Sequence, residues 1–202
     1  MGFLFDSLVH LLASEPAARQ SAAARMVGRV LGTEAIELGG VPAGAEFGVW
    51  HFRKVVARPF AVTITVGLAA SDVGEPGRVG QGHELIGLTL ADVKAPASAP
   101  VARALVAVAS QDLALGAVAP LPEGTFGRSS HTWVLRTELG DHIRDHAEYE
   151  RILGGRLDLI VPVTEREARW IEAHGADAYV RAMREQGVRP YADRAPGETR
   201  LA

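Results

Sequence analysis

The sequence predicts a single-domain α/β (α+β) protein in which helices flank a mixed β-sheet. Apolar residues recur at helical spacing before residue 32 and in several segments after residue 100. Between them lie short segments that alternate in polarity or are rich in β-branched residues, as strands are. At 202 residues, with 48% hydrophobic and 22% charged residues, the chain suits one domain with a buried core.

The composition excludes several classes of function. The sequence has no cysteine, which removes disulfides, thiol catalysis and zinc–thiolate sites and fits a reducing cytoplasm. A net charge of −3 gives no electrostatic footprint for nucleic acid or anionic lipid. No apolar run is long enough to span a membrane, and the first residues, which include Asp6, lack the features of a signal peptide. We therefore expect a cytoplasmic protein with no nucleic-acid or membrane partner.

Residues 1–34 predict an N-terminal helical segment that packs on the rest of the domain. Leucines between residues 4 and 12 form an apolar stripe at helical spacing. Ser14 is a suitable N-cap, and Pro16 falls in the first turn of a second helix that ends at Gly32. One longer helix, kinked at Pro16, is the alternative that the sequence leaves open.

Residues 35–187 predict the α/β domain itself, beginning with strands. Residues 47–52 alternate in polarity, and residues 60–66 and 84–90 are short, largely apolar segments with the composition of strands. Glu84 is unusual because it opens an apolar strand. A carboxylate there must face solvent or find a donor, so we expect a sheet edge or a buried ion pair with an arginine.

Further along the chain, helical and strand patterns alternate. Residues 101–115 have the spacing of a helix, and residues 132–137 and 156–163 have the character of strands. A charged stretch between these two strands, residues 141–151, predicts another helix. This order is typical of a mixed sheet with helices on its faces.

The C-terminal part predicts helices followed by a tail. Thr164 and Glu167 form a capping box, in which the threonine hydroxyl accepts from a backbone N–H and the glutamate reaches back. The helix that they open ends at Gly175, and residues 177–186 predict one more helix. Residues 188–202 are polar and contain two prolines, so we expect a flexible tail without a fold of its own.

A cluster of histidines and carboxylates is the candidate metal site. On a helix, His142 and His146 stand one turn apart on one face, the spacing at which two imidazoles can bind one metal ion. Asp141 and Asp145 form a parallel pair. The glutamate that zinc proteases carry beside the first histidine is replaced by Ile143, and the same residues also describe an ordinary solvated helix face. A metal-assisted hydrolase that uses His142 and His146 is therefore the alternative function.

Ser129, Ser130 and His131 form the other arrangement that suggests hydrolysis. The segment lacks the second glycine of a nucleophile elbow, and no helix follows to accept the turn. Polar turn residues ahead of a strand explain these side chains better. We therefore assign no catalytic residue and no cofactor from the residue patterns.

Three segments, taken in order, resemble the suppressor-of-fused domain family. Residues 63–68 (TITVGL) match a strand of that family, although Ala69 stands where a serine is usual. After a Gly-rich gap, Glu84 and Leu85 match the beginning of its next strand, and residues 159–167 (LIVPVTERE) resemble its proline–threonine–glutamate segment. The resemblance covers residues 49–186.

This resemblance implies a mixed α/β domain that works by binding other proteins. Members of the family from animals hold a transcription factor through a short peptide, and bacterial members include immunity proteins that neutralise the toxins of competing cells. We therefore expect a bacterial, non-enzymatic protein-binding domain with another protein as its partner, such as a toxin encoded nearby. The resemblance assigns no binding residues.

Overall fold

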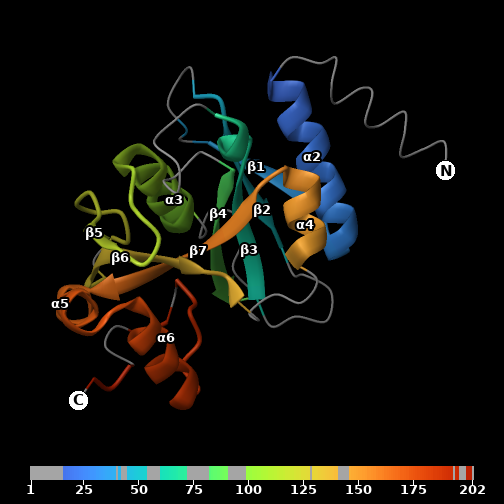
Figure 1. Ribbon diagram of the computed structural model, residues 1–202. Coiled ribbons are helices and arrows are strands. Elements are labelled where there is room, and N and C mark those ends of the chain that lie inside the picture. Colours follow the sequence, from blue (N-terminus) through green and yellow to red (C-terminus); the bar gives the residue numbers. More distant parts are fainter. Residues whose placement is uncertain are drawn as a thin grey trace.

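The structure is a computed structural model, and it describes residues 16–39, 41, 45–53, 60–71, 82–90, 99–127, 129–140, 146–192, 194–195 and 199–201. These residues form one α/β domain with a mixed sheet and helices against both of its faces (Figure 1). The predicted fold class is therefore confirmed.

In the described part of the chain, the sheet has seven strands in the order β1-β2-β3-β4-β7-β6-β5. Neighbouring strands are antiparallel except for β4 and β7, which run parallel. The strands are β1 (Ala35–Leu38), β2 (Gly48–Phe52), β3 (Phe60–Val66), β4 (His83–Leu90), β5 (Val118–Pro120), β6 (His131–Glu138) and β7 (Arg156–Thr164).

The parallel contact between β4 and β7 is short. Its register runs from His83 opposite Arg156 to Ile86 opposite Leu159. Farther along β4, Leu88 forms an isolated parallel bridge with Tyr191, and the N–H of Ala192 donates to the Leu88 carbonyl at 2.7 Å. A segment near the C-terminus thus takes the place beside β4 that β7 leaves.

Helices cover both faces of the sheet (Figure 1). The buried side chains of α2 and α4 share one hydrophobic cluster with those of α5 and α6, whereas α3 belongs to a second cluster on the other face. The helices are α2 (Pro16–Leu31), α3 (Ala99–Gln111), α4 (His146–Leu153), α5 (Glu165–His174) and α6 (Ala176–Glu185), and η1 (Leu68–Ala70) is a short 3₁₀ turn.

The close packing of α3 depends on a glycine in β4. A Cβ atom added at Gly87 would lie 2.3 Å from Cγ1 of Val101, far inside normal contact distance. The absence of a side chain at Gly87 therefore lets α3 approach the sheet. This is the packing role that glycine has where a helix backbone comes near a strand.

Most predicted elements are present. The capping box at α5 has both of its bonds: Oγ1 of Thr164 accepts from the Glu167 N–H at 3.2 Å, and Oε2 of Glu167 accepts from the Thr164 N–H at 2.7 Å. The prediction missed β1 and β5, which are four and three residues long. The predicted helix over residues 4–12 lies outside the described residues.

The C-terminal segment differs from the flexible tail that we expected. Val188, Ala192, Arg194 and Thr199 are buried, and Arg194 is only 7% exposed. Its guanidinium donates to the carbonyl of Pro162 at 2.8 Å, which ties the segment to β7. A few specific contacts thus anchor the described residues of this segment to the domain.

Candidate binding groove

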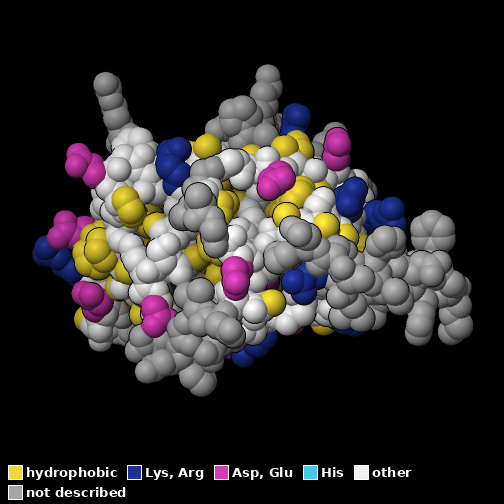
Figure 2. Space-filling view, turned by 90° about the horizontal axis from the view of Figure 1, so that it is seen from above, with side chains coloured by type: hydrophobic (Ala, Val, Ile, Leu, Met, Phe, Trp, Pro, Cys, Tyr) yellow, Lys and Arg dark blue, Asp and Glu magenta, His cyan; other side chains and the backbone are white. Residues whose placement is uncertain are grey.

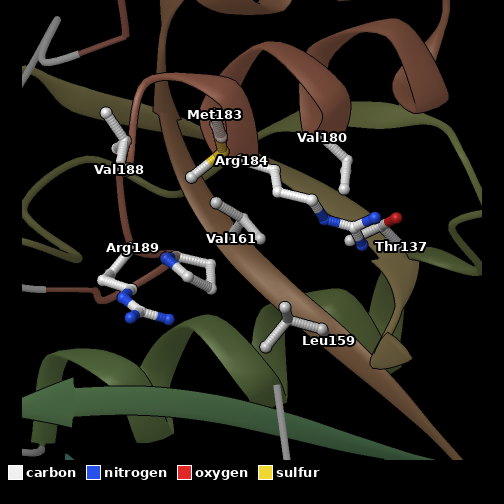
Figure 3. Close-up of a pocket in the computed structure, with 10 residues that line it drawn as sticks. Thr137, Leu159, Val161, Val180, Met183, Arg184, Val188 and Arg189 are labelled. Carbon is white, nitrogen blue, oxygen red and sulfur yellow. The ribbon is translucent and has the colours of Figure 1, made fainter. Parts of the chain in front are cut away.

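A groove beside α6 is the candidate functional site (Figure 3). It encloses 240 Å³ between α6, the segment that follows α6, and the ends of β6 and β7. The lining residues are Thr137 from β6, Leu159 and Val161 from β7, Val180, Met183 and Arg184 from α6, and Gly187, Val188, Arg189 and Pro190.

The turn after α6 forms one wall of the groove. Gly187 has a φ of 67°, a left-handed conformation that glycine adopts readily. The Gly187 N–H donates to the Arg184 carbonyl at 3.1 Å, and the Val188 N–H donates to the Met183 carbonyl at 2.9 Å. These are the two bonds of a Schellman motif, and they reverse the chain so that Val188 faces back toward the helix.

The charges that line the groove are positive. Arg184 and Arg189 are exposed, and they are its only charged lining residues in the described part of the chain. None of the ion pairs between described residues includes either of them. Figure 3 shows the Arg184 side chain extending toward Thr137 at one end of the groove, and Arg189 at the other.

A neighbouring hollow of 320 Å³ continues the groove past Arg184. It shares Thr137, Val180 and Arg184 and adds Glu138 and Asp177 among its lining residues. Its charges are therefore mixed, as they are on the face drawn in Figure 2, where acidic and basic side chains are interspersed with apolar ones. The groove of 240 Å³ differs from this hollow because its interior is apolar and its charged residues are the arginines at its two ends.

His131 lies in a buried polar cluster. Its Nδ1 is 3.3 Å from Oγ of Ser129, and its Nε2 is 3.1 Å from the Arg194 guanidinium. Burial, and then the Arg194 charge, lower the pKa of His131 to about 4. Arg194 also donates to the Tyr179 hydroxyl at 2.9 Å, and that hydroxyl donates to Oε1 of Glu167 at 2.8 Å. This cluster holds the C-terminal segment against β6, β7 and α5.

A second buried cluster crosses the sheet between β6 and β7. Arg136 is fully buried, and its Nε and Nη2 donate to Oδ2 of Asp158 at 2.8 and 2.5 Å. Nδ1 of His83 is 2.9 Å from the same oxygen, and Nη1 of Arg136 donates to the Leu113 carbonyl at 2.5 Å. The sequence did not predict this ion pair, because strand periodicity does not distinguish a buried arginine from an exposed one.

The environment of Glu84 differs from the sheet edge or arginine ion pair that we predicted. It is fully buried in an interior strand and not at an edge, and none of its hydrogen-bond partners among the described residues is an arginine. The Thr65 hydroxyl donates to Oε2 at 2.6 Å, and the N–H groups of Gly67 and Ala69 donate to Oε1 at 2.8 and 3.0 Å. Burial raises the pKa of Glu84 to about 7, although these hydrogen bonds act against the increase. The carboxyl group thus closes the turn from β3 into η1.

The predicted metal pair cannot be placed. His142 lies outside the described residues, and His146 is the half-buried first residue of α4. Among the described residues, no group of three or more His, Cys, Asp or Glu side chains could hold a metal ion.

No helix formed by the described residues is long and apolar enough to cross a bilayer.

Comparisons with known proteins identify the fold. No family model matches the sequence, and no curated protein matches it. Two solved structures match the fold. One, described as a SUFU (suppressor of fused protein) homologue from Neisseria gonorrhoeae FA 1090, has a TM-score of 0.64 and 15% identity, covering 91% of this chain and 99% of the other. The other, the Sufu–Fu complex, has a TM-score of 0.56 and 15% identity, covering 91% of each chain. The chain therefore has a suppressor-of-fused-like fold, as the sequence resemblance predicted.

Proposed function

We propose that this chain is a non-enzymatic domain that binds another protein through the groove beside α6. The observation that carries the proposal is an apolar groove with an arginine at each end, neither of which forms an ion pair with another described residue. Buried apolar centres with polar surroundings are typical of protein-binding surfaces, and arginine is enriched in them. One of the structures with this fold was solved as a complex, Sufu with Fu, which is consistent with a protein partner.

The buried polar clusters support a binding role over a catalytic one. A general base must reach the proton that it removes, and it works best with a pKa near the operating pH. Glu84 has a pKa of about 7, but it is fully buried and both of its oxygens accept hydrogen bonds from within the fold. His131 is 3% exposed, has a lowered pKa of about 4 and faces a guanidinium. Arg136 and Asp158 neutralise each other inside the sheet. Each of these clusters joins strands or segments, which is a sufficient reason for its presence.

We further propose that the chain is a cytoplasmic immunity protein and that its partner is a toxin encoded nearby. The test is to co-express the chain with the product of each adjacent gene in a bacterial host and to measure growth. Restored growth, together with a stoichiometric complex in titration calorimetry of the purified proteins, is expected for the toxin gene. If neither neighbour is toxic and neither binds, the immunity role is wrong.

The same assay separates binding from metal-dependent hydrolysis. Replacing both histidines, as H142A with H146A, is expected to leave partner binding and growth rescue unchanged. Elemental analysis of the purified protein provides the second measurement. A stoichiometric bound metal that is lost in the double variant together with growth rescue would favour the hydrolase.

A further inference from the structure

We propose that the groove beside α6 takes an extended peptide segment in which one aliphatic side chain is flanked by carboxylates. The inference rests on the proposed function and adds the chemistry of the partner. The aliphatic side chain enters the groove between β7 and α6, and the carboxylates bind Arg184 and Arg189 at its two ends.

The size of the groove favours a side chain over a whole small molecule. The apolar part of the groove encloses 240 Å³, less than the about 300–1,000 Å³ of pockets for drug-sized ligands and cofactors, and the hollow of 320 Å³ that continues it is lined mostly by polar and charged residues. Leu159 and Val161 supply the floor of the groove, and Val180, Met183 and Val188 lie beside them. Four of these side chains are already buried, so the hydrophobic gain comes mainly from the incoming aliphatic side chain, which leaves water without needing a hydrogen-bond partner.

The charges favour acidic groups beside that side chain. Arg184 and Arg189 are exposed, lack an ion-pair partner among the described residues and lie at opposite ends of the groove (Figure 3). Guanidinium groups bind carboxylates through paired, charge-assisted hydrogen bonds. The chain as a whole has a net charge of −3, so these arginines do not simply reflect a basic protein.

The neighbouring hollow limits how far the acidic segment extends. Beyond Arg184 the hollow is lined by Asp177, Glu138 and Arg181, so its charges nearly balance and it offers no net attraction for a further carboxylate. Glu138 is 3.3 Å from Arg156, an exposed pair that leaves this acid only partly neutralised. We therefore expect one carboxylate on each side of the aliphatic residue instead of a long acidic run.

The groove is formed before any partner arrives. Its outer wall is fixed by the bonds of Gly187 and Val188 to α6 and by the bond from the Ala192 N–H to the Leu88 carbonyl. A preformed site reduces the ordering entropy that binding must overcome. A short peptide should therefore bind without the rest of the partner protein.

A library of random 12-residue peptides displayed on phage provides the test. Selection against the purified full-length protein is expected to enrich peptides with a Leu, Ile, Val or Met flanked by Asp or Glu. Selected peptides are then labelled, and their affinity is measured by fluorescence anisotropy. The variant R184E with R189E should lose about tenfold or more in affinity, since it removes two exposed charge pairs, each worth up to about 1 kcal/mol, and adds two charges that repel the carboxylates.

The matched control changes the net charge equally at a distant place. Arg25 and Arg29 are exposed on α2, whose packing partners are α4, β1, β2 and β3. The variant R25E with R29E should change the affinity less than about twofold, because screening removes most of the interaction between distant exposed charges. Thermal unfolding of both double variants shows whether each retains the fold.

The outcomes separate this inference from the proposed function. Selected peptides that are neutral or basic, or that bind both double variants equally, overturn the carboxylate assignment and leave a protein-binding role intact, as does a selection that enriches nothing. Displacement by millimolar inorganic phosphate but not by acetate would show a phosphate site and also overturn the assignment. Acidic peptides that bind as expected, while no adjacent gene product does, would support the groove and contradict the proposed toxin partner.

Discussion

Replacing Glu84 with Gln tests whether a buried carboxyl group makes this fold less stable at neutral pH. Oε1 of Glu84 accepts from the N–H groups of Gly67 and Ala69, and Oε2 accepts from the Thr65 hydroxyl. A glutamine fits the same place, because its carbonyl can accept the two N–H groups and its amide can donate to Thr65 Oγ1. E84Q therefore removes the charge and preserves the shape.

The size of the effect follows from the pKa of Glu84, which burial raises from 4.5 to about 7. Between these values the folded state holds a proton that the unfolded state has lost, so the free energy of unfolding falls as the pH rises. The contribution of this proton is complete below pH 4.5 and is lost as the pH passes about 7. Since one pKa unit corresponds to about 1.4 kcal/mol, the total loss is about 3 kcal/mol.

The wild-type pH profile alone would not show this loss, because His131 acts in the opposite direction. Its pKa is about 4 in the folded state and 6.5 ordinarily, so the unfolded state holds more protons between these values. His131 thus makes the protein more stable as the pH rises over nearly the same range. The informative quantity is the difference in unfolding free energy between E84Q and the wild type at each pH, from which the contribution of His131 cancels.

Urea unfolding followed by circular dichroism, from pH 4.5 to pH 8, measures that difference. We expect E84Q to gain about 3 kcal/mol relative to the wild type over this range. Glu123 is exposed, and the matched variant E123Q should follow the wild-type curve. A difference between E84Q and the wild type that is constant with pH would refute the reasoning, since the carboxyl group would then have the same affinity for protons in both states.

Three further changes test the packing around the sheet. Arg136→Met leaves Asp158 buried without its guanidinium partner, and we expect urea unfolding to show that the free energy of unfolding falls by about 3–5 kcal/mol. Adding Asp158→Asn should recover part of this free energy. No recovery would contradict the ion-pair explanation. Gly87→Ala places a Cβ atom 2.3 Å from Cγ1 of Val101 and should lower the free energy of unfolding by about 1–3 kcal/mol, which Val101→Ala should partly restore. Arg194→Met removes the anchor of the C-terminal segment, so the amides of residues 188, 189, 191 and 192 should exchange faster in deuterium exchange while those of α3 remain unchanged.

The strands of the sheet centre were predictable because their burial is continuous. Every residue of β3 is buried, and β7 is buried at all but its first and last residues, which gives each a strong apolar signature. The short edge strands β1 and β5 are partly exposed and lack that signature. The capping box was also predictable, since it depends on residues three apart in the chain.

The groove could not be predicted from local pattern. Leu159 and Val161 look like ordinary strand residues, and Arg184 looks like a solvated helix residue; only the tertiary fold brings them together. One local signal was available in retrospect. Gly187 directly after a helix is typical of a Schellman turn, which reverses the chain over the last turn of that helix.

The position of the groove wall depends on β4, because the backbone groups of Leu88 need hydrogen-bond partners there. Where β7 separates from β4, the backbone groups of Leu88 on that side would be buried without partners, which costs about as much as a lost hydrogen bond. Tyr191 and Ala192 satisfy this requirement, and Arg194 fixes the segment beyond them. A partner that displaced the segment would expose these groups again, whereas one that bound beside it would keep them paired. We therefore expect a partner to bind with the C-terminal segment in place, so that Arg194→Met weakens peptide binding by loosening the wall and not by removing a contact.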